Sequence, residues 1–392
     1  MKNKKKILFI HNSVPEYRIE FWKLLDKKVE LYLLITSKNL EKKIYNLEKN
    51  VEDLNINYLD EKSYLLNMEN LNYDAIILPP DDSFKNYFLS KKILKIASKK
   101  NIPCFFWNER WELNNIKKTL TKSTKDFIHR LMIKDISKSC DGLIASGTLS
   151  SEFLINLGFS ANNIKIAIDS STSPEVNIPL NFEKKYGILD SDNLILFFGR
   201  VIEQKGPKVL LEAFDNIQKK DTWLMICGEG DYLESCIDYV KENNINKVIF
   251  TGKIQPYLRA AYYKRADVFV IPSIPLNGVI ESWGLTVNES LEQGTPVIAT
   301  STVGASIDLI DDSNGITVSP NSVPELAEAI NELLKNRLNE DIVRKSYLKN
   351  DVTNMSEQFY KAIFFDTVGR KCCLLCPFSS SANSFRVHPN CP

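Results

Sequence analysis

Short apolar runs alternate along the chain with stretches in which apolar residues recur at helical spacing. In the first 150 residues the runs that predict strands are 7–10, 31–35, 75–78, 104–107 and 143–145. Each run has helical sequence on at least one side, such as 19–26 after the first. Strands that are apolar throughout and separated by helices indicate a parallel sheet with helices on both faces.

The alternation is interrupted at 166–192, where Ser, Pro, Asn and Asp are frequent, and then resumes. The later runs that predict strands are 194–198, 223–227, 248–250, 268–271, 297–299 and 316–318, and the helical stretches between them include 206–218, 232–243, 258–264, 284–293 and 323–336.

The interruption predicts a crossing between two doubly wound α/β domains. We expect an N-terminal Rossmann-like domain over 1–170 and a second one over 190–350. A helix over 351–366 should return to the first domain, and an irregular Cys-rich tail should fill 367–392. In such folds ligands bind beyond the carboxyl ends of the strands, so the loops after these strands should carry the chemistry.

Composition is that of a water-soluble globular protein, with 44% hydrophobic and 25% charged residues. No apolar run approaches the roughly 20 residues of a membrane-spanning helix. The first six residues are basic, but the apolar run after them is too short for a signal peptide. The cysteines at 104, 140, 227 and 236 lie in apolar segments, as free core thiols do. We therefore expect a cytoplasmic protein.

The net charge of +1 conceals an asymmetry, because residues 1–150 have 27 Lys and Arg against 19 Asp and Glu. Segment 117–138 has seven basic residues against Asp126 and Asp135, together with apolar residues such as Phe127, Leu131 and Ile136. A basic amphipathic helix of this kind can lie on the anionic inner face of a membrane as a peripheral anchor. A solvated helix with a core-facing stripe has the same pattern. No nucleic-acid-binding motif accompanies the charge.

Two basic residues follow the strand at 194–198, in the order Gly199, Arg200, Lys205 and Gly206. A glycine at a strand end allows a tight turn, and fixed Arg and Lys side chains suit a diphosphate. An ordinary basic surface loop would look similar. The next strand ends in the glycine-flanked turn 228–230, Gly228-Glu229-Gly230, which by itself is a generic strand-to-helix turn.

A pair of glutamates, Glu281 and Glu289, brackets the predicted start of a helix at Gly284, Leu285 and Thr286. The unpaired amides of a helix N-terminus attract anions. One carboxylate could then meet a sugar and the other a ribose, although most glutamates at this spacing are solvated helix surface.

In order and interval these pieces resemble family 4 of the glycosyltransferases, the retaining group that has the GT-B fold of two Rossmann-like domains. The resemblance covers roughly 139–366 and includes 140–146, 294–298 and 303–305. It implies an enzyme that transfers a hexose from a nucleotide-sugar to a saccharide or lipid-linked acceptor with retention of configuration. It also implies a place in the synthesis of a surface polysaccharide or glycolipid.

Residue by residue, the resemblance implies that Arg200 and Lys205 bind the donor diphosphate and stabilise the leaving group. Glu281 would contact the transferred sugar and Glu289 the ribose. Donor-binding positions would also include Gly199, Gly228, Glu229, Gly230, Gly284, Leu285, Thr286 and Gly304. A leaving phosphate oxygen would take the acceptor's proton, without a metal or other cofactor. The sequence agrees in having only three scattered histidines, His11, His129 and His388.

The chain departs from the family at Asp308, where a Glu is frequent, and in the loop after its first strand, where many members are Gly-rich. This loop has Pro15, Tyr17 and Arg18, and we expect Arg18 to offer a cation to the acceptor. Asn108 and Glu109 follow another strand, as sugar-contacting residues would. The sequence leaves open the nucleotide base, the sugar and the acceptor. A sugar-nucleotide epimerase or a non-catalytic nucleotide-sugar-binding subunit stays an alternative.

Overall fold

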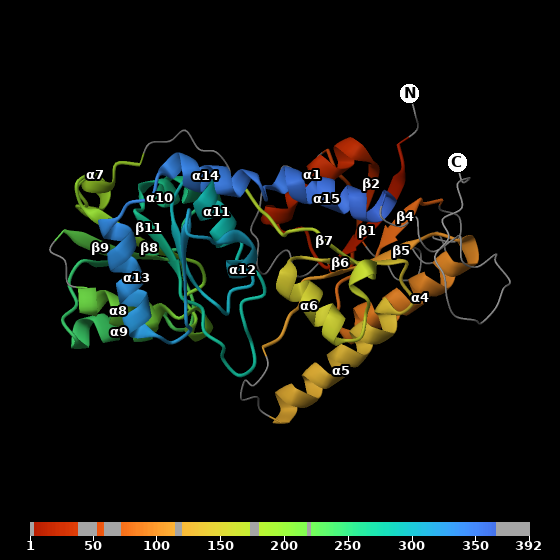
Figure 1. The fold of residues 1–392 in the computed structure, drawn as a ribbon, viewed down its shortest axis with the longest axis horizontal. Helices are drawn as coiled ribbons and strands as arrows, with labels where there is room; N and C mark the ends of the chain where they lie inside the picture. Colours follow the sequence, from red (N-terminus) through yellow and green to blue (C-terminus); the bar gives the residue numbers. More distant parts are fainter. Residues whose placement is uncertain are drawn as a thin grey trace, which may run out of the picture.

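The computed structural model describes residues 4–37, 53–58, 72–113, 120–172, 180–217 and 221–365. The Cys-rich tail and Lys117 and Lys118 therefore lie outside the described residues. Two lobes are visible in Figure 1, one formed by the N-terminal half of the chain and one by the C-terminal half.

The N-terminal lobe contains a parallel sheet in the order β3-β2-β1-β4-β5-β6-β7. Its strands are β1 (Lys6–His11), β2 (Glu30–Ile35), β3 (Asn55–Tyr58), β4 (Ala75–Ile77), β5 (Cys104–Asn108), β6 (Gly142–Ala145) and β7 (Ile164–Ile166). Its helices are α1 (Glu16–Lys28), α4 (Phe84–Lys100), α5 (Leu120–Ser137) and α6 (Thr148–Asn156).

The C-terminal lobe repeats the plan with the parallel order β10-β9-β8-β11-β12-β13. Its strands are β8 (Asn193–Phe198), β9 (Thr222–Cys227), β10 (Val248–Gly252), β11 (Val268–Ile271), β12 (Val297–Thr300) and β13 (Gly315–Val318). Its helices are α7 (Phe182–Tyr186), α8 (Pro207–Ile217), α9 (Leu233–Glu242), α10 (Arg259–Arg265), α11 (Thr286–Glu292), α12 (Ser306–Leu309), α13 (Val323–Lys335) and α14 (Glu340–Leu348). The prediction of two parallel-sheet α/β domains is confirmed.

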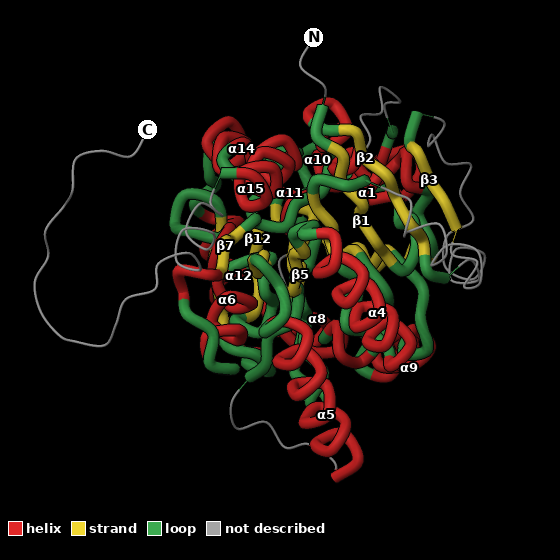
Figure 2. The backbone as a smooth tube through the Cα atoms, turned by 90° about the vertical axis from the view of Figure 1, so that its right-hand side faces the viewer, coloured by secondary structure: helices red, strands yellow, loops and turns green. Residues whose placement is uncertain are grey.

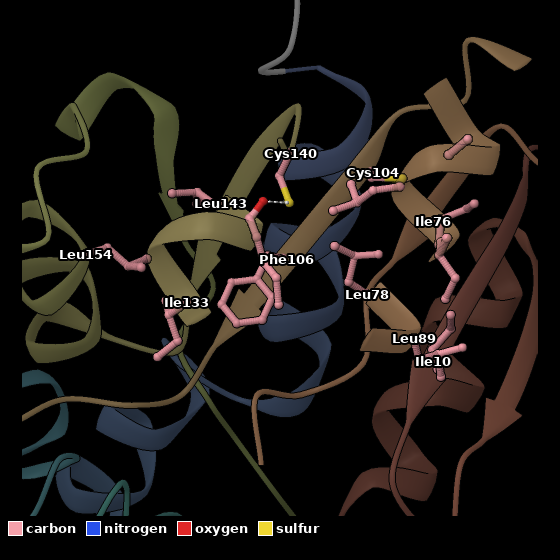
Figure 3. Close-up of a cluster of buried hydrophobic side chains, with 14 of the residues drawn as sticks. Ile10, Ile76, Leu78, Leu89, Cys104, Phe106, Ile133, Cys140, Leu143 and Leu154 are labelled. Carbon is pink, nitrogen blue, oxygen red and sulfur yellow. Dashed lines mark hydrogen bonds between the residues drawn. The ribbon is translucent and has the colours of Figure 1, made fainter. Parts of the chain in front are cut away.

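The inner strands of each sheet are apolar on both faces because helices cover both faces. In β1, Ile7 and Phe9 point into one buried cluster, while Leu8 and Ile10 point into another. Figure 3 shows part of the second cluster around Phe106 of β5. Burial of such side chains, at about 25 cal/mol per Å² of apolar surface, is the main term that stabilises the sheet.

The last helix, α15 (Val352–Phe364), returns to the N-terminal lobe and lies along α1 (Figure 1). Asp351 begins it by accepting a hydrogen bond from the amide of Asn354. Phe359 is fully buried against Phe21 and Trp107, at ring-centroid distances of 5.0 Å from each. The helix therefore completes the hydrophobic core of a domain from which it is far removed in sequence.

Candidate active site

Each sheet has one point at which the strand order reverses, between β1 and β4 and between β8 and β11. Loops diverge at such a point, so the carboxyl edge of the sheet is exposed there and ligands bind to it. The predicted donor residues follow β8 and β11, and the predicted acceptor residues follow β1 and β5.

Lys205 and Glu281 come together although 76 residues separate them. The ammonium of Lys205 donates to Oε2 of Glu281, and both side chains are about one-sixth exposed, at 17% and 15%. The hydroxyl of Ser273, just after β11, lies 3.4 Å from the same oxygen. An ammonium has three donors, so Lys205 can hold Glu281 and still bind a phosphate oxygen.

Arg200 is exposed on the β8 loop that leads to Lys205. Within the residues described, no hydrogen bond or ion pair engages its guanidinium. Gly199 beside it has φ +154°, and a Cβ there would meet nothing within 4 Å. The loop thus offers a free cation and open space at the same edge of the sheet.

The glycines of the β9 turn lie very close to the β8 loop. A Cβ on Gly228 would lie 1.7 Å from the carbonyl oxygen of Gly199, and one on Gly230 would lie 2.2 Å from that of Val201. These glycines therefore let the β9 loop pack against the β8 loop. Glu229, between them, is exposed.

At Gly304, too, other parts of the protein lie very close to the glycine. A Cβ there would lie 2.0 Å from the carbonyl oxygen of Ser282 and 3.0 Å from Nε1 of Trp111.

Helix α11 begins at Thr286, later than expected, and has seven residues. Gly284 is buried, while Leu285 and Thr286 are half-buried beside Glu281.

Glu289 is 3% exposed, so it is not the solvated helix-surface glutamate that its spacing also allowed. Its two oxygens accept hydrogen bonds from Arg259, at 2.8 Å, and from the hydroxyl of Tyr263, at 3.0 Å. Burial raises the pKa of Glu289, while both partners oppose the rise. Arg259 also donates to Glu16 of the N-terminal lobe at 3.1 Å, so one guanidinium joins the two lobes.

Arg18 does not offer a free cation, because it is 2% exposed. It donates to both oxygens of Asp169 and, at 2.6 Å, to Glu109, and it stacks 4.6 Å from the Trp107 ring. Burial alone would lower the pKa of Arg18, but the charges of Asp169 and Glu109 raise it above its ordinary value. The arginine thus ties α1 to the segment that crosses between the domains.

Of the other residues predicted on the acceptor side, Asn108 is fully buried and bonds to Ser150 and the carbonyl of Arg110, so its role is structural. Pro15 is the buried N-cap of α1, and Tyr17 is half-buried under the Arg18 guanidinium. Glu109 has a side chain that is 45% exposed and remains available to a ligand.

A pocket of about 40 Å³ lies at the β1/β4 reversal point, and Glu109 is the one predicted acceptor residue among those that line it. It is lined by Phe9, Ile10, His11, Leu78, Pro80, Asp81, Trp107 and Glu109. Nδ1 of His11 is 2.8 Å from the carbonyl oxygen of Ser13, which can only accept, so Nδ1 carries the proton and Nε2 has a lone pair. Burial, with the charge of Arg18, lowers the pKa of His11 to about 4. His11 Nε2 and the carboxylates of Asp81 and Glu109 therefore line the pocket as hydrogen-bond acceptors.

Two more hydrogen bonds join the lobes near these sites. Trp111 Nε1 donates to the carbonyl of Ser282 at 2.9 Å, and the amide of Thr148 donates to Asp308 at 2.9 Å. The Asp at 308, a departure from the family pattern, thus reaches the first turn of α6. No group of three or more His, Cys, Asp or Glu with metal-binding geometry occurs in the described part of the chain.

Comparison with known proteins places this geometry in context. The chain is 28% identical over 253 residues to "Uncharacterized glycosyltransferase MJ1607" of Methanocaldococcus jannaschii, which covers 62% of this chain and 61% of that protein. It is 38% identical over 118 residues to "Alpha-monoglucosyldiacylglycerol synthase" of Streptococcus pneumoniae, covering 29% of this chain and 26% of that protein. The chain thus aligns with less than two thirds of either relative.

A solved structure of Anabaena Alr3699/HepE in complex with UDP superposes with a TM-score of 0.70 and 16% identity, over 91% of this chain and 99% of that one. At this identity the similarity establishes the fold alone. Residues 180–349 match the family Glycosyl transferases group 1. The C-terminal lobe is therefore similar to a Glycosyl transferases group 1 domain, and the chain has the two-domain GT-B fold.

Proposed function

We propose that the protein transfers a sugar from a nucleotide-diphosphate sugar to a saccharide or lipid-linked acceptor, with retention of anomeric configuration. The observation that carries the proposal is the meeting of Lys205 with Glu281 beside the free Arg200 at the β8/β11 reversal point. The UDP bound to the Anabaena protein and the lipid product in the name of the Streptococcus relative support the two substrate classes.

Arg200 and Lys205 would bind the donor diphosphate, on which negative charge grows as the glycosidic bond breaks. Charges fixed before the reaction need no reorganisation, so they stabilise the transition state more than the bound donor. Oε2 of Glu281 holds Lys205, and Oε1 can accept a hydroxyl of the transferred sugar. Glu281 thus orients the lysine and the sugar together.

Glu289 would hold the ribose hydroxyls. Each carboxylate oxygen has about two lone-pair positions, so the bonds from Arg259 and Tyr263 leave acceptor capacity. Because Arg259 would lose its buried partner, Glu289→Gln should lower stability as well as raise the donor KM.

The N-terminal lobe would bind the acceptor at the β1/β4 reversal point. His11 Nε2 and the carboxylates of Asp81 and Glu109 all accept hydrogen bonds, so a hydroxyl-bearing acceptor complements them. The acceptor hydroxyl would attack the anomeric carbon on the face that the diphosphate leaves. Its proton would pass to the leaving phosphate oxygen, and the bond to that oxygen would break.

We further propose that the reaction takes place at the cytoplasmic side, contributes to a surface polysaccharide or glycolipid, and needs no metal. In the residues described, no helix is both long and apolar enough to cross a membrane. Two cations near the diphosphate can provide the charge that a divalent ion would otherwise supply. A chelator should therefore leave turnover unchanged.

The test begins with UDP-, GDP- and ADP-sugars as ligands in thermal unfolding. A donor at a hundred times its Kd should stabilise the protein by about 2.7 kcal/mol. Lys208→Ala, an exposed lysine on α8, is the matched control and should keep this protection, whereas Arg200→Ala should lose most of it. The protecting donor is then used for transfer to polyol, saccharide and diacylglycerol acceptors, and NMR of the product gives its anomeric configuration. The proposal fails if no nucleotide-sugar protects the protein.

A further inference from the structure

Helices α4 and α5 lie side by side on the outside of the N-terminal lobe (Figure 2). They run in the same sense, since Asp81 just before α4 is near His129 and Tyr87 and Lys91 both donate to Asp135 at 2.8 Å. The first half of α4 therefore lies beside the second half of α5.

The outward stripe of α4 begins with two exposed aromatic residues. Phe84 is 57% exposed and Phe88 is 59% exposed. Positions three or four residues apart share a helix face, and the stripe continues in exposed Lys92, Lys95 and Lys99. Leu89 and Ile93 belong to the buried core, so α4 packs on the lobe through a face other than the one that bears the two phenylalanines.

Helix α5 repeats this arrangement. Phe127 is 61% exposed and Leu131 is 51% exposed, and Lys134 and Lys138 follow on the same side. Met132, Ile133 and Ile136 are buried, so the helix also has a separate core-facing stripe. A groove of about 390 Å³ between the helices is lined by Tyr87, Ile128, Leu131, Met132, Lys134, Asp135 and Lys138.

The charge of this face is almost entirely positive. Helix α4 has six lysines and no acid, and α5 has four basic residues against Asp126 and Asp135, a joint net charge of +8. This equals the whole excess of residues 1–150. Asp126 is buried against Arg110 and Lys122, and Asp135 is held by Lys91 and Tyr87. Lys92, Lys95 and Lys99 are exposed to solvent, and α4 itself has no carboxylate to offset their charge.

We propose that the face formed by Phe84, Phe88, Phe127 and Leu131 with the lysines of α4 and α5 binds an anionic lipid surface. Large apolar side chains can enter the headgroup region while lysines beside them meet anionic headgroups. A protein partner fits less well because lysine is depleted in protein interfaces. Nucleic acid would use the cations and leave four apolar side chains in water.

The orientation places the acceptor side of the lobe near the lipid. The apolar half of α4 begins directly after the loop that contains Asp81, and α5 contacts the loop after β5 through Arg110 and Glu112. Lipid binding itself does not depend on the proposed function. If that function holds, the acceptor pocket opens next to the surface in which a lipid-linked acceptor is dissolved.

The experiment measures cosedimentation of the full chain with phosphatidylcholine vesicles, with and without phosphatidylglycerol, at several salt concentrations and without any substrate. We expect tighter binding to the anionic vesicles that weakens as salt is added. Replacing Phe84, Phe88, Phe127 and Leu131 by Ser should weaken binding about ten-fold or more. Replacing Lys92, Lys95, Lys99 and Lys138 by Gln should weaken it about five-fold for each lysine.

Matched controls come from the C-terminal lobe. Replacing exposed Leu189, Ile307, Ile342 and Leu348 by Ser, or exposed Lys184, Lys335, Lys345 and Lys349 by Gln, should leave binding unchanged. A Phe88→Trp variant should be quenched by brominated acyl chains, and Leu348→Trp should not. Equal binding to both vesicle types overturns the proposal. The proposal is also overturned if only the lysine variant loses vesicle binding and the protein binds a soluble oligonucleotide as tightly as it binds anionic vesicles. That result would indicate nucleic acid as the ligand. Thermal unfolding verifies that each variant is folded.

Discussion

The two lobes each place an arginine in the loop region after the first strand of their sheet, and they use it in opposite ways. Arg18 follows β1 and is 2% exposed, with Asp169 and Glu109 around it. Arg200 follows β8 and is exposed, and no ion pair in the described part of the chain holds it. Residue type and topological position are alike, so neither is enough to identify a ligand-binding cation.

Arg18 and Arg200 differ in burial because different parts of the chain lie next to them. Asp169 belongs to the segment that leaves β7 for the second domain, and it is buried where Arg18 projects from the first turn of α1. Among the described residues, none lies within 4 Å of a Cβ built on Gly199, so the β8 loop has open space at this point. A cation is a binding group only when its own protein leaves its donors free.

The largest effect should come from replacing Arg18, the buried arginine of the two. Arg18→Met leaves the buried carboxylate of Asp169 without its partner, which should destabilise the fold by about 3–5 kcal/mol. Arg200→Met should change stability by no more than about 0.5 kcal/mol. Urea unfolding of the two variants measures both values, and similar losses would refute the distinction.

Replacing the basic residues of the exposed β8 loop should affect catalysis rather than folding. Arg200→Ala and Lys205→Ala should each lower turnover about 10²–10³-fold, because each removes a preorganised charge from the diphosphate. Steady-state kinetics at one salt concentration measures the loss, and Lys208→Ala serves as the control. Turnover equal to the parent in both variants would show that the diphosphate does not bind to this loop.

Acid should affect the N-terminal site through His11. Its folded pKa of about 4 lies below the unfolded value of 6.5, so the unfolded state binds more protons between these pH values. Stability should therefore fall as pH falls from 6.5 to 4, by up to about 3 kcal/mol from this residue. His11→Asn can keep the donor to Ser13 and should show a smaller loss. If the parent and His11→Asn lose the same free energy of unfolding between pH 6.5 and 4, the assignment of a neutral His11 is contradicted.

The smallest effect should come from the link between the lobes. Trp111→Phe removes the indole donor to the carbonyl of Ser282, next to Glu281, and should cost about 1 kcal/mol. We expect turnover to fall about five-fold because Glu281 is less firmly placed. Trp223→Phe removes a similar donor to Asp192, at 2.9 Å, and should affect stability alone. Unchanged turnover in Trp111→Phe would mean that this bond does not position Glu281.

The sequence predicted most of the fold because buried parallel strands are apolar on both faces and leave a strong local signal. The strand over 268–271 was predicted with its observed bounds. Strand β3 was missed because its residues, Asn55 to Tyr58, are polar and mostly exposed at the sheet edge. Strand β7 was missed because it is a short edge strand with a lysine at its centre, Ile164 to Ile166. Such edge strands are defined by pairing with a neighbour, which no local pattern records.

At the sites, the sequence by itself determined which residues have the chemistry for a donor, since Arg200, Lys205 and Glu281 were identified by type, order and spacing. Only the tertiary structure decided which of the predicted groups are free. It buried Glu289 under Arg259 and Tyr263 and paired Arg18 with Asp169, 151 residues away. It also brought His11 and Asp81 into one pocket. Charge and hydrogen-bonding capacity are properties of a residue, but burial and partners depend on which distant segments pack against it, and that is set by the fold.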